Sequence, residues 1–263
     1  MRKEKEIDED MKFLAKSEIR LTILDELLKT PKTIRELSKK TDIPYSSISN
    51  NIAKLEESDH IFKIKSKYNI NTITEMKYKN ILDFKKSVDL INNYKKLWNK
   101  HNIDQLSPES IKNISDLNDI CLIETTPVDI YKTHNTIKEQ MTQTNTLYAI
   151  FPYLHPEYPK LIENILREDG FVEIIIPQNI FNEIVFEIDE KIRRQSMKNG
   201  NLKIYATNQE LHLYLTICDN SMSLGLFKND GSFDQNRILT SKNKSSQNWA
   251  SNLFDDIKNS VIL

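Results

Sequence analysis

The sequence has 263 residues and is 38% hydrophobic, which is enough to build one large domain or two modest ones. No apolar run approaches the ~20 residues needed to cross a bilayer, and the first twelve residues lack the apolar stretch of a signal peptide. We therefore expect a soluble, cytoplasmic protein with no membrane partner. The net charge of -1 hides an asymmetry, because residues 1–100 carry 22 Lys and Arg against 16 Asp and Glu, whereas residues 101–263 carry 15 against 22. The amino-terminal part is the one suited to a polyanion.

The first predicted element is an amphipathic helix over Phe13–Leu28, which Thr30 and Pro31 end. A second, short helix begins at Thr33, because Thr33 and Glu36 have the spacing of a capping box. It ends near Lys40, and residues 41–43 make a tight connection to a third helix.

The third helix carries Pro44 in its first turn, where the missing N–H is tolerated. Its apolar residues recur at spacings of four and three, which places polar residues on the opposite face. The apolar set is Ile48, Ile52 and Leu55, and the outward set is Ser46, Ser47, Asn50 and Lys54. This pattern is typical of a helix-turn-helix, whose second helix enters the major groove of DNA. The alternative is a plain helical hairpin with a solvated polar face.

A hairpin follows the helix-turn-helix. His60–Lys65 alternates like a half-buried strand, residues 66–67 can turn the chain, and Tyr68–Asn71 can return as the partner strand. Lys63, Lys65 and Lys67 lie on this hairpin, where a wing contacts phosphates. Residues 1–74 are therefore predicted to form a winged helix-turn-helix domain.

A winged helix-turn-helix domain indicates duplex DNA as the partner. We expect Ser46, Ser47 and Asn50 to read base edges, and Asn51, Lys54 and the wing lysines to contact phosphates. The full set of expected DNA-binding residues is Lys32, Tyr45, Ser46, Ser47, Ser49, Asn50, Asn51, Lys54, Lys63, Lys65 and Lys67. The charge is modest, with nine basic against five acidic residues between Lys29 and Lys67. Two copies would therefore be needed for high affinity, which favours a homodimer.

Residues 75–100 contain no glycine or proline and read as one long helix within a linker over residues 75–104. Apolar residues at alternating spacings of three and four form a stripe that a lysine interrupts. The stripe is Ile81, Phe84, Val88, Ile91, Lys95 and Trp98. It is either a dimer contact or the buried face of a connecting helix, and the sequence leaves both readings open.

Strand-like and helix-like runs alternate in residues 105–263, which predicts an α/β domain with a mostly parallel sheet. The runs are 120–124, 129–142, 147–151, 158–167, 171–176, 180–197 and 202–205, followed by a hairpin over 212–218 and 221–227 and a last helix over 249–257. Cys121 and Cys218 are expected to be buried thiols, with no metal site and no disulfide. No cofactor is expected, since no glycine-rich loop is present.

Four residues of this domain are candidates for ligand binding. His155, Glu157 and Tyr158 follow a predicted strand, where α/β sheets bind ligands, although the same segment also reads as the start of a helix. Asp219 reads either as a ligand-binding residue or, with Asn220, as a hairpin turn.

Several segments resemble one family. They are FLAKSEIRLTILDEL, IPYSSISNNIAKLEE, LWNKHNIDQLSPESI, FPYLHPEY, SLGLFKNDGSFDQNRILTSKN and WASNLF, running from about Phe13 to Asp256. They resemble archaeal winged-helix regulators with a methanogenesis-regulator (FilR-like) carboxy-terminal domain. The resemblance implies a dimeric, DNA-binding transcriptional regulator whose second domain senses a signal. It also implies that this domain is a non-catalytic, phospholipase D-like fold. Enzymes of that fold use an HxK motif, and none of the five histidines here has a lysine two residues later.

Two hypotheses follow. In the first, the chain is a transcriptional regulator whose DNA affinity changes when a small-molecule effector binds the α/β domain. In the second, the α/β domain is an enzyme acting on a small substrate, and the winged helix serves only for assembly. A turnover that His155→Ala abolishes and Asn50→Ala preserves would favour the enzyme.

Overall fold

The computed structural model describes residues 9–117 and 119–262. The chain divides into two compact units, residues 1–88 and 89–263. The division falls inside a long helix, between the expected domain boundaries at residues 74 and 104. Expectations for residues 1–8 lie outside the described part of the chain. Among the described residues, no helix combines the length and the hydrophobicity that crossing a bilayer requires.

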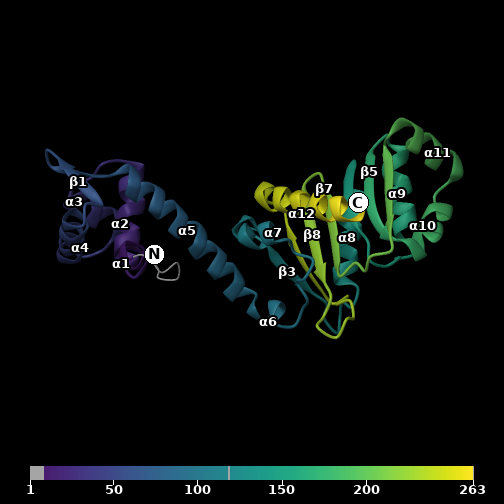
Figure 1. The fold of residues 1–263 in the computed structure, drawn as a ribbon, viewed down its shortest axis with the longest axis horizontal. Coiled ribbons are helices and arrows are strands. Elements are labelled where there is room, and N and C mark those ends of the chain that lie inside the picture. Colours follow the sequence, from purple (N-terminus) through teal and green to yellow (C-terminus); the bar gives the residue numbers. More distant parts are fainter. Residues whose placement is uncertain (1–8, 118, 263) are drawn as a thin grey trace, which may run out of the picture. The chain divides into compact units, whose positions relative to one another are not determined.

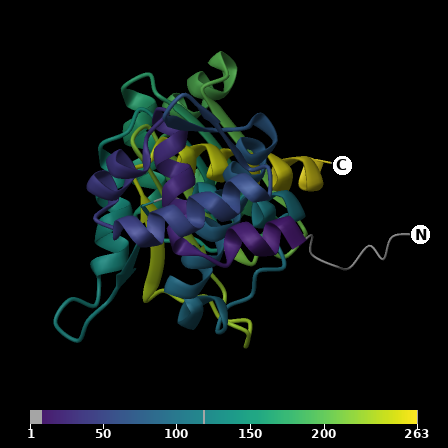
Figure 2. The ribbon, with the colours of Figure 1, turned by 90° about the vertical axis from the view of Figure 1, so that its left-hand side faces the viewer.

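The first unit consists of helices and a two-stranded hairpin, and it faces the viewer in Figure 2. Its elements in chain order (Figure 1) are α1 (Glu9–Ala15), α2 (Glu18–Lys29), α3 (Ile34–Thr41), α4 (Tyr45–Glu57), β1 (Ile61–Ile64), β2 (Lys67–Ile70) and the first part of α5 (Thr72–Asn93). Leu24, Leu37, Ile48, Ile52 and Leu55 are buried where α2, α3 and α4 pack together. The apolar face predicted for the third helix, Ile48, Ile52 and Leu55, is confirmed.

The single helix predicted over Phe13–Leu28 is wrong, because α1 and α2 are separate helices. The Ser17 hydroxyl accepts a hydrogen bond from the Arg20 N–H at 3.4 Å and caps the start of α2. Apolar spacing does not reveal the break, since Leu14 and Leu21 are both buried on either side of it.

The turn between α3 and α4 follows the sequence signals closely. The Thr33 hydroxyl accepts from Glu36 N at 3.2 Å, and the Glu36 carboxylate accepts from Thr33 N at 2.7 Å, which confirms the capping box. Asp42 adopts a left-handed conformation, with φ 57°, and ends α3. Pro44 is the N-cap residue of α4 and not a residue of its first turn.

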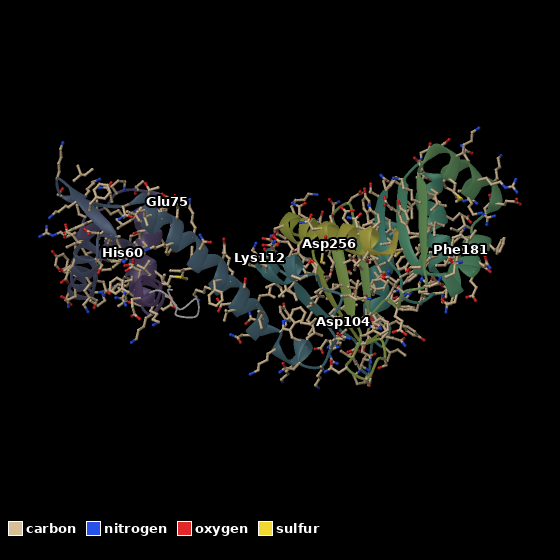
Figure 3. All side chains as sticks on the ribbon, viewed as in Figure 1. His60, Glu75, Asp104, Lys112, Phe181 and Asp256 are labelled. Carbon is tan, nitrogen blue, oxygen red and sulfur yellow. The ribbon has the colours of Figure 1, made fainter. Side chains whose placement is uncertain are left out.

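The predicted wing is a hairpin in which β1 pairs antiparallel with β2. Its turn is Lys65–Ser66, one residue earlier than predicted, with Lys65 at φ 56°. The main chain of Lys32 also pairs with that of Tyr68, as an isolated antiparallel bridge beside the hairpin. His60, labelled in Figure 3, lies buried at the base of the wing with its Nδ1 3.0 Å from the Thr74 hydroxyl.

The helix predicted over residues 75–100 is interrupted at Tyr94, after which α6 (Lys95–Trp98) begins. Of the predicted stripe, Ile81 is buried, whereas Phe84 is 70% exposed and Ile91 is 43% exposed. The stripe is therefore not simply the buried face of a connecting helix. A dimer contact stays a prediction.

The second unit is a three-layer α/β domain. Its helices are the last part of α5, α6, α7 (Pro108–Lys112), η1 (Ile114–Asp116), α8 (Lys132–Thr142), α9 (Tyr158–Arg167), η2 (Gln178–Ile180), α10 (Phe181–Glu187), α11 (Glu190–Asn199) and α12 (Lys244–Ile262). Its strands are β3 (Cys121–Glu124), β4 (Thr146–Ile150), β5 (Phe171–Pro177), β6 (Leu202–Thr207), β7 (Leu213–Cys218), β8 (Ser221–Leu226) and β9 (Arg237–Ser241). They form one sheet in the order β3-β9-β8-β7-β4-β5-β6.

The prediction of a mostly parallel sheet is wrong, because the sheet is mixed. Only the β4–β5 and β5–β6 pairs are parallel, and the other neighbouring strands pair antiparallel. The helix α8 connects β3 to β4 as predicted, but β9, β8 and β7 lie between these two strands. The predicted β7–β8 hairpin is confirmed.

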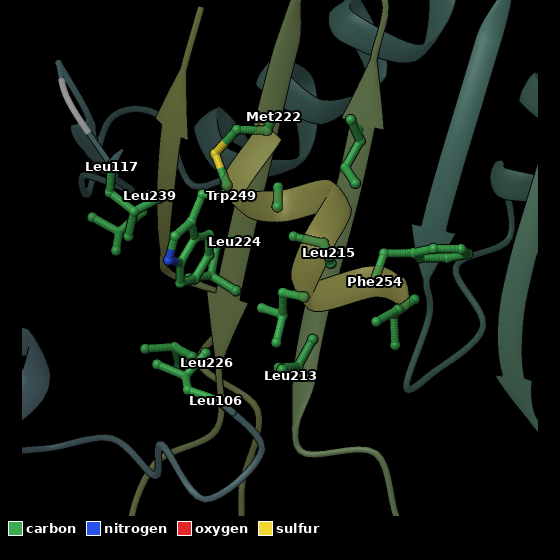
Figure 4. Close-up of a cluster of buried hydrophobic side chains, with 14 of the residues drawn as sticks. Leu106, Leu117, Leu213, Leu215, Met222, Leu224, Leu226, Leu239, Trp249 and Phe254 are labelled. Atoms are coloured by element: carbon green, nitrogen blue, oxygen red, sulfur yellow. The ribbon is translucent and has the colours of Figure 1, made fainter. Parts of the chain in front are cut away.

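Alternate residues of each strand point to opposite faces of the sheet, and helices cover both faces. On one face α12 packs over β7 and β8, where Leu215, Leu224, Trp249 and Phe254 form part of one core (Figure 4). On the other face α8, α9 and α10 cover a second core that contains Ile174. Cys218 is buried, but Cys121 is exposed because it begins the edge strand β3. The prediction of two buried thiols was therefore wrong for Cys121.

A buried glutamate joins α9 to the start of α11. The Glu163 carboxylate accepts hydrogen bonds from Lys160 at 2.8 Å, Arg167 at 2.8 Å and the Asp189 N–H at 2.9 Å. The Lys160 ammonium and the Asp189 N–H lower the pKa of Glu163 to about 2, against the opposing effect of burial.

This network predicts an acid-sensitive contribution to stability. A depressed carboxyl pKa stabilises the native state above the ordinary pKa of a glutamate, and this stabilisation disappears as the pH falls toward 2. The Glu163→Gln variant should therefore unfold more easily than the parent at pH 7, and the difference should shrink between pH 5 and pH 2. Urea unfolding at a series of pH values checks this, with the exposed Glu168→Gln as control. A difference that is constant with pH would contradict it.

Candidate DNA-binding surface and ligand sites

The outward face of α4 consists of polar side chains at the predicted positions. Tyr45 is 52% exposed in the first turn, and Ser46, Asn50 and Lys54 are exposed along the helix. Ser47, Ser49 and Asn51 are half-buried. Because Ile48, Ile52 and Leu55 fix the opposite face in the core, the polar face is held on a rigid element. It presents hydroxyl and amide groups, which can donate to and accept from base edges.

The hairpin presents its three lysines to solvent. Lys63, Lys65 and Lys67 are exposed, and the Lys63 ammonium lies 5.3 Å from the centroid of the Tyr68 ring. Phe62 and Ile64 are also exposed, so the half-buried alternation predicted for this strand holds only at Ile61. Exposed ammonium groups of this kind can contact phosphates.

Lys32 has a structural role within the first unit. Its main chain pairs with Tyr68, and its ammonium donates to the Glu26 carbonyl at 2.6 Å and lies 3.4 Å from the Glu26 carboxylate. Its side chain is 14% exposed. Of the eleven residues predicted to bind DNA, Lys32 is therefore the one whose charge is most fully engaged within the chain.

Sequence reasoning missed two lysines beside this region. Lys39 and Lys40, in the last turn of α3, line a hollow of about 700 Å³ together with Lys32, Lys67 and Glu36. The excess of basic residues between Lys29 and Lys67 was the signal for them. Residues of the first helix of a helix-turn-helix lie where that helix crosses the DNA backbone.

In the second unit the structure brings together only some of the four predicted ligand residues. His155 and Glu157 lie in the loop between β4 and α9, where they meet His134 of α8. The Glu157 carboxylate binds His134 Nε2 at 2.5 Å and also the Lys138 ammonium. These two contacts, the Lys138 contact foremost, lower the pKa of Glu157 to about 2. Burial and the nearby His134 lower the pKa of His155.

Tyr158 lies beside His155, with the ring centroids 5.1 Å apart, but it is fully buried in the core, where its ring stacks on Phe151 at 4.5 Å. Asp219 lies in the β7–β8 turn, where its carboxylate accepts from Asn145 N at 2.7 Å, just before β4 begins. His155 follows the other end of β4, so the structure does not place Asp219 near it. The turn reading of Asp219 and Asn220 is confirmed.

A cavity of about 690 Å³ opens at the carboxyl ends of the parallel strands β4, β5 and β6. Its lining is polar and aromatic, including Tyr153, Gln178, Asn208, Gln209 and His212. Ligands of α/β sheets bind in crevices at this edge. The sequence analysis considered only the residues that follow β4. The same reasoning applied to the residues that follow β5 and β6 would have identified Gln178, Asn208 and Gln209 as well.

Two family models match the chain. The model for the N-terminal domain of methanogenesis regulatory protein FilR1 matches residues 8–88, and the model for its middle domain matches residues 130–260. A curated relative is methanogenesis regulatory protein FilR1 of Methanothrix harundinacea (strain 6Ac), which is 20% identical over 142 residues. That match covers 51% of this chain but only 31% of the relative.

Similar solved structures are also regulators or DNA-associated proteins by their descriptions. TrmBL2, described as an archaeal chromatin protein with a novel mode of DNA binding, has a TM-score of 0.42 and 13% identity, with 95% of this chain and 99% of that chain covered. An IclR transcriptional regulator from Alicyclobacillus acidocaldarius has a TM-score of 0.25 and 9% identity, with 97% and 98% covered.

Proposed function

This chain belongs to the FilR-like family of archaeal transcriptional regulators, and from that premise we propose that it binds duplex DNA through α4 and the β1–β2 hairpin. The observation that carries the proposal is the exposed polar face of α4, held on a buried three-helix core beside a hairpin with three exposed lysines. In this proposal Ser46, Ser47 and Asn50 contact base edges. Sequence is read by such groups, whereas phosphate contacts set position and affinity.

The phosphate-binding groups of the proposal lie around this face. The exposed lysines near it and the half-buried Asn51 would contact the DNA backbone: Asn51, Lys54, Lys63, Lys65 and Lys67, with Lys39 and Lys40 added from the structure. Tyr45 and Ser49 flank the base-reading residues. Lys32 would act by holding the hairpin in place. Its main chain pairs with Tyr68 of the hairpin, and its ammonium is bound to Glu26 of α2.

A homodimer is part of the proposal. One module offers few phosphate contacts, and two modules on half-sites about one DNA turn apart (~34 Å) would double them. The exposed Phe84 and Ile91 of α5 are the residues we propose for a contact between two copies. Sedimentation of the parent and of a Phe84→Ser variant tests this, since a monomer in both would contradict it.

We further propose that a small-molecule effector binds the cavity at the carboxyl ends of β4, β5 and β6 and changes the affinity for DNA. A ligand can shift this equilibrium only if it binds the DNA-competent and incompetent states with different affinity. The cytoplasmic location and the phospholipase D-like character of the domain also stay predictions. The matched family is one of regulators, and the alternative of an enzyme is not adopted.

A thermal-shift screen against cellular metabolites tests the effector proposal. A compound that binds the native state at 100 times its Kd should stabilise the protein by about 2.7 kcal/mol. Asn208→Trp should abolish that shift, because Asn208 lines the cavity and a tryptophan would fill it. Asn199→Trp, at the exposed end of α11, is the matched control and should respond as the parent does. A compound that still shifts Asn208→Trp fully would place its site elsewhere.

A further inference from the structure

Three potential metal ligands converge between α8 and the loop that precedes α9. His134 comes from α8, and His155 and Glu157 come from the loop after β4. One ligand atom from each of the three lies within 4.8 Å of the others. The imidazole rings of His134 and His155 stack with their centroids 3.9 Å apart.

We propose that His134, His155 and Glu157 bind one divalent transition-metal ion of the zinc class. Such an ion takes nitrogen and oxygen ligands at about 2.0–2.2 Å, so that two donors on a tetrahedral ion lie about 3.4 Å apart. The present separations, from 2.5 Å between His134 Nε2 and Glu157 to at most 4.8 Å, bracket this value. The two rings are stacked with 23° between their planes, so at least one ring must rotate out of the stack to point its nitrogen lone pair at the ion.

The donor set selects the class of ion. Two imidazoles and one carboxylate suit zinc, cobalt, nickel or copper, whereas magnesium and calcium prefer oxygen ligands throughout. The side chains of His134 and Glu157 are 18% and 42% exposed, so an ion can enter from solvent. Three protein ligands also leave at least one coordination position for water or another small ligand.

Lys138 competes with the proposed ion for the carboxylate of Glu157. It lies one helical turn after His134 on α8, and its ammonium binds the other oxygen of the Glu157 carboxylate. When the ion binds one oxygen of Glu157, the ammonium on the other oxygen repels it, since both are cations. Removing the ammonium should therefore strengthen metal binding, which distinguishes a metal site from a simple network of ion pairs.

Sequence reasoning predicts no metal site, since His134 and His155 lie in different elements without a known ligand spacing. The proposal departs from that expectation and does not depend on DNA binding. A metal site would clamp the start of α9 to α8, in a unit that contains none of the proposed DNA-binding residues.

Calorimetric titration of the full chain with Zn²⁺ and Co²⁺ tests the proposal. The parent should bind one ion per chain, and His134→Ala and Glu157→Gln should each weaken binding by at least about tenfold. Lys138→Met should bind the ion more tightly than the parent. The matched control is Glu168→Gln, because Glu168 is an exposed glutamate of the same unit that lies outside the cluster.

Several outcomes would overturn the proposal. These are no stoichiometric binding by the parent, unchanged binding by His134→Ala, weaker binding by Lys138→Met, or an equal loss in Glu168→Gln. Circular dichroism checks that each variant is folded. If a variant is unfolded, paramagnetic Co²⁺ added to the parent decides the matter by NMR, because only the ring signals of nearby histidines broaden. Broadening at His134 and His155 supports the site, and broadening at neither contradicts it.

Discussion

Asn50→Ala should weaken binding to the preferred duplex by about 5- to 150-fold, which corresponds to ~1–3 kcal/mol. Asn50 lies in the middle of the exposed face of α4, one position past Ser49 and two past the buried Ile48. An asparagine side chain pairs with adenine through two hydrogen bonds, and alanine removes both. Binding to unrelated duplexes should change little, since those complexes rest on phosphate contacts. Fluorescence anisotropy with both duplexes at one salt concentration measures this difference.

A matched control separates base reading from a general effect of the substitution. Asn92 is an exposed asparagine on α5, outside the proposed interface, and Asn92→Ala should bind both duplexes as the parent does. Both variants should keep the stability of the parent, since neither side chain is buried. Equal affinity of Asn50→Ala and the parent for every duplex would remove Asn50 from the interface.

The second large effect is expected from the hairpin. Replacing Lys63, Lys65 and Lys67 together by alanine removes three ammonium groups that the structure leaves exposed. Each phosphate contact contributes about 0.9 to the slope of log affinity against log salt, so the slope should fall by about 3 for each bound protomer. At 0.1 M salt this corresponds to a loss of at least about 100-fold on all duplexes alike. A salt titration of binding checks both quantities.

The control for this variant carries the same change of charge at another place. Lys95, Lys96 and Lys100 are exposed lysines on and after α6, in the second unit. Their triple alanine variant should keep the salt slope of the parent almost unchanged. If both triple variants lost affinity equally, net charge and not the position of the hairpin would explain binding.

Local signals predicted the winged helix well, because its elements depend on nearby residues. The capping box of Thr33 and Glu36, the apolar spacing in α4 and the hairpin were all readable from neighbouring positions. The break at Ser17 was missed because a serine at that place has two uses, inside a helix or as its cap. The turn of the hairpin was misplaced by one residue because Lys65 adopts a left-handed conformation usually taken by glycine or asparagine.

The order of strands in the second unit was not predictable in the same way. Periodicity shows that a strand exists but not which strand it pairs with, and β3 pairs with β9 from the far end of the chain. His134 and the cavity residues were missed for a similar reason. His134 contacts Glu157 only because α8 packs beside α9, and the cavity residues meet only because three strands end at one edge.

The central claim is that the outward face of α4 lies against the bases of duplex DNA. The structure of the full chain bound to a duplex selected from a random-sequence pool tests it most directly. We expect α4 in the major groove, with the side chain of Asn50 within hydrogen-bond distance of a base edge and the hairpin lysines at phosphates. A complex in which this face of α4 is turned to solvent, or is covered by residues 89–263, would contradict the account.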